Sequence, residues 1–137
     1  MPIYSKKYVV PAATAQSYDL EVEGDIITYV RLRFPPGPQG LLNIRIKYGI
    51  KQIFPYAENT YFAGDNEIID WQEYFVLPET PCTLTVEAIN NDDTYEHSFY
   101  LVLVTQKREH LLSQLIAQAV RAEISKFIMR LTGALTE

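Results

Sequence analysis

The chain has 137 residues, a formal net charge of −5 and a single cysteine. A chain of this length buries about two-thirds of its unfolded surface in one domain, and one cysteine cannot form an intramolecular disulfide. Residues 1–106 carry 14 acidic and 7 basic side chains, a net charge of −7, whereas residues 107–137 carry 3 acidic and 5 basic ones, a net charge of +2. The acidic body repels phosphates, so we expect no binding to nucleic acids.

The first residues, MPIYSKKYVVPAATA, contain a basic pair but no apolar run as long as that of a signal peptide. We interpret this segment as a β-strand. We expect no export by the usual signal and no transmembrane span, so the predicted location is the cytoplasm or a virion.

Four runs in the first half of the chain predict β-strands, because apolar and polar residues alternate in them between turn residues. These runs are residues 3–10, 17–23, 25–34 and 41–49, and the turn-forming sequence PPGPQG separates the last two. With a period of two, one face of the third strand is predicted to hold Thr28, Val30, Leu32 and Phe34.

The runs 25–34 and 41–49 both place basic residues on the face opposite their apolar residues. We expect the two runs to be neighbours in one sheet, where these residues would form a basic stripe. Such a stripe could contact acidic groups of a neighbouring subunit or an anionic glycan, or it could pair with acidic residues across the sheet. The stripe consists of Arg31, Arg33, Arg45 and Lys47.

Five further short runs follow at intervals typical of antiparallel strands, with no helical pattern between them. They are residues 50–54, 67–71, 73–77, 83–89 and 97–104. The sequence therefore predicts an antiparallel β-sandwich, jelly-roll-like and of about eight strands, over residues 1–105.

Motifs of catalysis are missing from the sequence. The two histidines belong to no HExxH or CxxC spacing, and no glycine-rich phosphate-binding loop occurs. Cys82 has no nearby histidine in sequence, and we expect it at the start of a buried strand. We therefore predict no enzyme, no zinc site and no cofactor, with calcium as the one ion to consider.

Calcium is considered because the segment NNDDTYEH is rich in side-chain oxygens, the ligands that this ion prefers. The same residues are typical of a hairpin turn, and the segment lacks the spacing and the glycine of an EF-hand. The turn is the favoured interpretation. The calcium candidates are Asn90, Asp92, Asp93 and Glu96.

Aromatic residues close to the middle of the chain allow two interpretations. Trp71, Tyr74 and Phe75 could form a platform on which a sugar stacks, or they could pack in the core and at its rim. Core or rim packing is the favoured interpretation.

The last segment, residues 106–137, predicts a separate oligomerisation element. Residues 107–131 contain no Gly or Pro and form a helix of about 38 Å, with Gly133 as its stop. An apolar stripe runs along it at steps of three and four residues. The stripe consists of Leu112, Leu115, Ile116, Ala119, Val120, Ile124, Phe127, Ile128 and Leu131.

Three surfaces can cover this apolar stripe: the protein's own sandwich, other copies of the helix, or a membrane. Arg121, Lys126 and Arg130 would suit a membrane surface, but Glu123 interrupts them and the helix is too polar to span a bilayer. The strands already supply the sandwich core, so we favour self-association in a homo-oligomer.

The stretches FPPGPQGLLNIRIKYGIKQIFP and EAINNDDTYEH, within residues 20–105, resemble small jelly-roll-like structural or decoration proteins from virions of bacterial and archaeal viruses. The C-terminal helix is not part of this resemblance. The resemblance implies a non-enzymatic protein that presents a sandwich on a particle surface or at a multimeric joint.

Together these observations predict a self-assembling structural or interaction protein, a component of a virion, that oligomerises through its C-terminal helix. Its expected partners are other copies of itself and a larger protein assembly, with no nucleic acid and no membrane. The alternative is a carbohydrate-binding β-sandwich module that depends on calcium or works without it.

Overall fold

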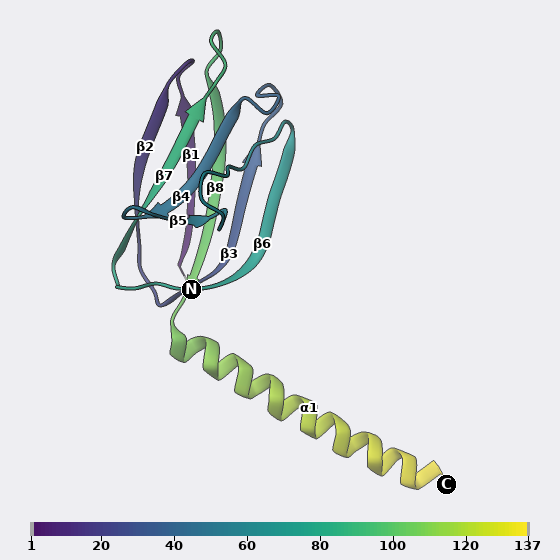
Figure 1. Cartoon of the computed structure of the whole chain (residues 1–137). Coiled ribbons are helices and arrows are strands. Elements are labelled where there is room, and N and C mark those ends of the chain that lie inside the picture. The colour runs from purple at the N-terminus through teal and green to yellow at the C-terminus, as the bar shows by residue number, and fades with distance from the viewer. Residues whose placement is uncertain (1, 137) are drawn as a thin grey trace. The chain divides into compact units, whose positions relative to one another are not determined.

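Eight β-strands and one α-helix make up the computed structural model, which describes residues 2–136. The strands form one unit that ends at Gln106, and the helix forms a second unit (Figure 1). The elements are β1 (Ile3–Val10), β2 (Ala15–Val22), β3 (Ile26–Phe34), β4 (Leu42–Tyr48), β5 (Lys51–Phe54), β6 (Glu67–Val76), β7 (Cys82–Asn90), β8 (His97–Gln106) and α1 (Arg108–Thr136).

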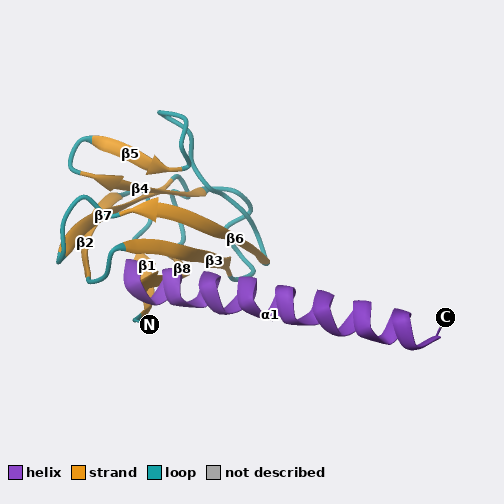
Figure 2. Ribbon diagram, turned by 90° about the horizontal axis from the view of Figure 1, so that it is seen from below, coloured by secondary structure: helices purple, strands orange, loops and turns teal. Residues whose placement is uncertain are grey.

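The strands form two four-stranded antiparallel sheets, with the orders β1-β8-β3-β6 and β2-β7-β4-β5. Figure 2 shows the sheets as two layers. The pairing is nested: β1 pairs with β8, β2 with β7, β3 with β6 and β4 with β5. An eight-stranded chain that folds back on itself in this way forms a jelly roll. The predicted fold class, a jelly-roll-like sandwich followed by one long helix, is confirmed.

The core lies between the two sheets and consists of alternate residues of the strands. On β7 and β8 every second side chain is buried and its neighbours are more exposed. This alternation is what a strand with one face on the core requires. The largest side chains that are fully buried are Phe34, Phe99, Ile26, Ile27, Leu32, Leu42, Ile44 and Ile46.

The expectation that residues 25–34 and 41–49 are neighbours in one sheet is wrong. Their strands, β3 and β4, lie in different sheets, and the connection through Gly37 and Gly40 carries the chain from one layer to the other. The nested pairing gives the reason. Because β3 pairs with β6 and β8, and β4 with β5 and β7, β3 and β4 form no ladder with each other.

The prediction for Thr28 is also wrong. The register of β3 with both of its neighbours shifts between Ile27 and Tyr29, as in a β-bulge. An extra residue in one strand inverts the alternation on one side of it. Ile27 therefore joins the core in place of Thr28, while Val30 and the later residues keep their predicted faces.

Two other strand predictions have different outcomes. The runs 67–71 and 73–77 are one continuous strand, β6, because Gln72 pairs with β3 and no turn separates the runs. Cys82 is fully buried as the first residue of β7, as predicted. Burial, followed by the nearby charge of Glu79, raises the pKa of its thiol, which makes it a poor nucleophile at neutral pH.

Helix α1 is longer than the sequence predicted and passes through Gly133. A glycine ends a helix when it adopts a left-handed conformation, and Gly133 is not among the glycines with positive φ. In a helical conformation a glycine costs only about 1 kcal/mol, which neighbouring helix formers tolerate. In the described part of the chain, no helix combines the length and apolar character that a bilayer crossing needs.

Strand β8 pairs with a neighbour on both sides and has one face on the core. Truncation of successive residues in it should therefore change the free energy of unfolding by different amounts. Leu103→Ala should lower the free energy of unfolding by about 2–5 kcal/mol, because Leu103 is fully buried and its loss leaves a cavity. Val102→Ala, on the outer face, should cost clearly less. Denaturant titration of both variants makes the comparison, and equal losses would contradict the assignment of the two faces.

Candidate functional sites

The apolar stripe of α1 is the largest exposed apolar feature of the helix. Its eight large side chains are each 51–61% exposed, and Ala119 is exposed as well. These eight are Leu112, Leu115, Ile116, Val120, Ile124, Phe127, Ile128 and Leu131. Their role in oligomerisation stays a prediction.

The stripe turns slowly around the helix axis. At about 100° per residue, Leu131 lies about 100° around the axis from Leu112. From Ile116 the apolar positions recur at steps of 4, 4, 3 and 4, so Val120 lies seven residues before Phe127 and eleven before Leu131. A seven-residue repeat favours a left-handed twist between helices and an eleven-residue repeat a right-handed one, so this mixture of spacings sets no handedness.

The four basic residues predicted as a stripe lie on two sheets and do not form one surface feature. Arg45 lies opposite Glu87 in the ladder of β4 with β7, and its Nε lies 2.5 Å from Glu87 Oε2. Lys47 Nζ lies 3.4 Å from Glu87 Oε1. Burial acts to raise the pKa of the Glu87 carboxyl, but the hydrogen bond and charge of Arg45, with Lys47, outweigh it and hold that pKa below its ordinary value.

The two basic residues of β3 have different surroundings. The Arg33 guanidinium lies 5.4 Å from the centre of the Tyr100 ring, within the range of a cation–π contact. Arg31 lies opposite Asp70 in the ladder with β6. A contact of Arg31, Arg33, Arg45 or Lys47 with an anion or a partner stays a prediction.

The segment from Asn90 to His97 crosses from one sheet to the other, because β7 and β8 belong to different sheets. The hairpin interpretation is therefore wrong. Asn90 is only 2% exposed, and its Nδ2 donates to the carbonyl oxygens of Val10, Pro11 and Tyr95 at 3.0–3.3 Å. Its side chain fastens the crossing segment to the end of β1.

Asp92 organises the rest of this segment. Its Oδ1 accepts hydrogen bonds from the backbone N–H groups of Thr94 and Tyr95, and its Oδ2 lies 2.7 Å from His97 Nε2. The hydrogen bond from Thr94 N–H, followed by that of His97, holds the pKa of the Asp92 carboxyl below its ordinary value. The described residues contain no group of three His, Cys, Asp or Glu side chains that could hold a metal ion. Calcium binding by Asn90, Asp92, Asp93 and Glu96 stays a prediction.

A lowered pKa in the folded state means that ionised Asp92 stabilises the fold. This contribution is fully present above the ordinary carboxyl pKa of about 4 and is lost as the pH falls through the lower value of the folded state. Asp92→Asn should therefore lower the melting temperature at neutral pH, and the difference from the unmodified chain should vanish in acid. Asp93→Asn is the control for simple loss of charge in the same segment. A difference between Asp92→Asn and the unmodified chain that does not change with pH would contradict this role of Asp92.

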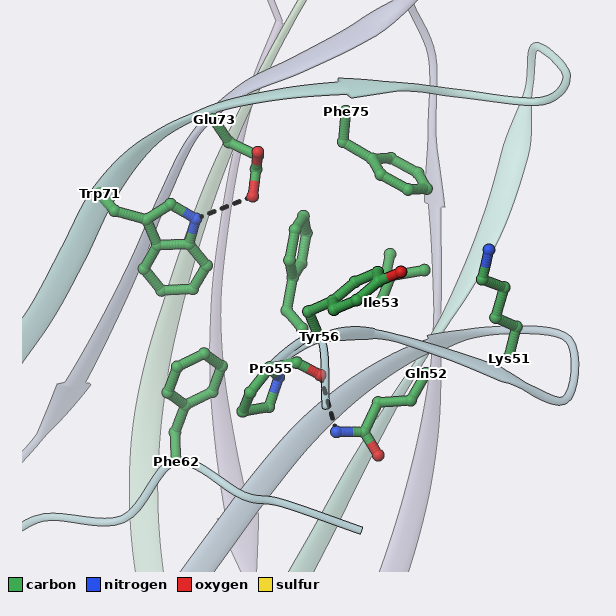
Figure 3. Close-up of a pocket in the computed structure, with 10 residues that line it drawn as sticks. Lys51, Gln52, Ile53, Pro55, Tyr56, Phe62, Trp71, Glu73 and Phe75 are labelled. Carbon is green, nitrogen blue, oxygen red and sulfur yellow. Dashed lines mark hydrogen bonds between the residues drawn. The ribbon is translucent and has the colours of Figure 1, made fainter. Parts of the chain in front are cut away.

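A pocket of about 360 Å³ lies where the strands β5 and β6 form the edges of the two sheets. Strand β5 has 4 residues and β6 has 10, so β5 covers only part of the inner face of β6. Figure 3 shows Trp71, Glu73 and Phe75 extending from β6 toward Tyr56 and Phe62.

Aromatic rings make up most of the pocket wall. Phe54 meets the rings of Trp71 and Phe75 edge-on, with centres 5.6 and 5.7 Å apart, and Phe62 stacks on Trp71 at 5.1 Å. Tyr74 lies on the other face of β6 and is 62% exposed. Trp71, Tyr74 and Phe75 therefore do not form one platform, and the favoured interpretation of rim packing describes Trp71 and Phe75, which pack against the core.

Four further residues of this site were not predicted from the sequence: Phe54, Phe62, Glu73 and Gln52. Gln52 is 4% exposed, and its Nε2 lies within 3.0 Å of the carbonyl oxygens of Pro55, Ala57 and Thr60 (Figure 3 shows the bond to Pro55). It therefore holds the loop that carries Tyr56. The only sign of this role in the sequence was that Gln52, a polar residue, stands next to the apolar residues before Pro55.

Loss of the Gln52 side chain should destabilise the loop and the fold together. Gln52→Ala leaves carbonyl groups beside the pocket without their donor, which should cost about 1–3 kcal/mol in the free energy of unfolding. Lys51→Ala, at the exposed neighbouring position, should change it by less than about 0.5 kcal/mol. Urea titration distinguishes the two variants, and a neutral Gln52→Ala would show that the loop does not depend on this amide.

Comparison with known proteins gives only distant likenesses. No protein-family model and no curated protein matches the chain. A Yersinia pseudotuberculosis-derived mitogen is similar with a TM-score of 0.45 and 7% identity over 77% of this chain and 86% of the mitogen. The periplasmic inhibitor of g-type lysozyme from Aeromonas hydrophila is similar with a TM-score of 0.42 and 12% identity over 74% of this chain and 83% of its own.

A viral protein is also among the similar structures. The infectious bursal disease virus VP2 subviral particle gives a TM-score of 0.38 and 10% identity over 76% of this chain and 33% of the VP2 chain. All three scores are too low for an argument about function. The more specific resemblance to virion proteins of bacterial or archaeal viruses stays a prediction.

Proposed function

We propose that this chain is a non-enzymatic structural or interaction protein that assembles with copies of itself through α1, as a structural or decoration component of a virion. The observation that carries the assembly is the apolar stripe, with eight large side chains that are each more than half exposed on one helix. Apolar patches of this extent on a soluble protein mark contact surfaces. The virion part rests on analogy, because viral capsid domains often have the jelly-roll strand order, as do lectins.

The energy available from the stripe is of the size that an oligomer needs. Complete burial of a large apolar side chain contributes about 1.5–3 kcal/mol, so covering the exposed half of each one contributes roughly 1 kcal/mol. Eight such side chains then contribute on the order of 8 kcal/mol per helix. Two or more helices together can offset an association cost of about 4–15 kcal/mol.

Copies of the same helix are the partner that fits best. The stripe is wide and extends over most of the helix, and another copy has an apolar surface of the same length with which to cover it. Charged residues beside the stripe can form ion pairs within the same helix. Lys126 Nζ, for example, lies 3.5 Å from Glu123 Oε1. A membrane surface would instead call for a more basic polar face.

Two matched double variants of the full chain test this proposal. Val120→Glu with Ile124→Glu places two charges in the stripe, whereas Gln118→Glu with Ser125→Glu places the same charges on the opposite side of the helix. By light scattering, we expect the unmodified chain and the second variant to have the mass of one defined oligomer. The first variant should have the mass of a single chain, because burying unpaired carboxylates is too costly.

Circular dichroism of each variant checks that the sandwich remains folded. If the unmodified chain has the mass of a single chain at all concentrations, or if the stripe variant keeps the oligomer mass, the proposed assembly is wrong.

A further inference from the structure

We propose that the aromatic pocket between β5 and β6 binds a neutral sugar. The pocket is separate from α1, so this proposal does not depend on assembly through the helix. Its volume of about 360 Å³ is within the range of pockets that hold small molecules.

Part of the aromatic surface in the pocket wall is accessible to a ligand. Trp71, Phe62 and Phe75 are only partly buried, and Tyr56 is largely exposed, although all four line the pocket. The face of an aromatic ring carries partial negative charge. A sugar ring presents C–H groups on its faces, which suit such a surface, while its hydroxyl groups point outward from its edge.

Glu73 and Gln52 determine which hydrogen bonds a ligand can form in the pocket. Glu73 accepts a hydrogen bond from Trp71 Nε1 on Oε1 at 3.2 Å and one from the Tyr74 backbone N–H on Oε2 at 2.9 Å. These bonds fix the carboxylate at the pocket wall, and a carboxylate has about four acceptor sites, so about two remain for a ligand. The donors of Gln52 are already used by the backbone. A ligand must therefore bring hydroxyl or N–H donors to Glu73.

The charged residues of the pocket favour a neutral ligand. The pocket has one acidic residue, Glu73, and one basic residue, Lys51, at its wall. A cation would face the Lys51 ammonium and an anion would face the Glu73 carboxylate, whereas a neutral molecule with both donors and acceptors suits both. A purely apolar ligand would displace water from Glu73 and give it no partner. Among neutral molecules, a sugar combines apolar ring faces with a polar edge.

Binding here should be independent of calcium, because the pocket shares no residue with the segment from Asn90 to His97. The site would therefore correspond to the form of the carbohydrate-binding alternative that works without calcium.

Tryptophan fluorescence of the full chain provides the test, because Trp71 is the only tryptophan. We expect titration with glucose, galactose, N-acetylglucosamine and cellobiose to change the emission of Trp71 in a saturable way for at least one sugar. The change should persist in the presence of a calcium chelator. Saturation-transfer NMR on the same sugar confirms binding without relying on the fluorophore.

Three variants locate the site. Glu73→Ala should weaken binding about tenfold or more, because hydrogen bonds to a charged group are lost. Phe62→Ala should weaken it as well, because one face of the pocket wall is removed. Tyr74→Ala is the matched control, since Tyr74 lies on the outer face of the same strand, and it should bind like the unmodified chain. Melting curves confirm that each variant is folded.

Three results would overturn the proposal: no sugar in the panel binds, Glu73→Ala and Phe62→Ala both bind like the unmodified chain, or cyclohexanol binds as tightly as the sugars. The last result would identify an apolar pocket without sugar recognition.

Discussion

The burial of one apolar layer between two sheets is the interaction on which the rest of this structure depends. Alternate residues of the strands face this layer, and the nested pairing of β1 with β8 through β4 with β5 brings them together. Among the strands that pair with each other, only β4 and β5 are joined by a tight connection, which passes through Gly49. Every other pair joins distant parts of the chain, so the core must form for these pairs to be stable.

The crossing segment after β7 and the aromatic pocket both follow from this arrangement. Because the chain changes sheet after β7, its crossing segment has backbone groups at the end of the core, and Asn90 and Asp92 satisfy them with side-chain hydrogen bonds. Because β5 is short, the inner face of β6 is incompletely covered, and Trp71 and Phe75 line a pocket there. The arrangement of the two sheets thus explains both the hydrogen-bonded crossing segment and the pocket at the edge of β6.

Local patterns in the sequence predicted the faces of strands but not their partners. In β4 the face opposite the predicted basic residues holds Leu42, Ile44 and Ile46, and all three are buried in the core. Alternation has the same form in either sheet, however, so it could not reveal that β3 and β4 are in different layers. The bulge at Thr28 depends on cross-strand register, and the pocket depends on Phe54, Phe62 and Trp71 converging from three segments. None of these has a local signal.

Helix α1 differs in this respect, because its structure is local and its apolar stripe can be read directly from the spacing of residues. The proposed partner of that stripe is the α1 helix of another copy. Intermolecular distance measurement between spin labels on Ser125→Cys chains tests this proposal most directly, since Cys82 is fully buried and leaves the introduced thiol as the reactive one. Helices in contact have axes about 10 Å apart, so labels on the outer faces of neighbouring copies should be close enough to show dipolar coupling. A sample with no coupling between labels would contradict self-assembly through α1.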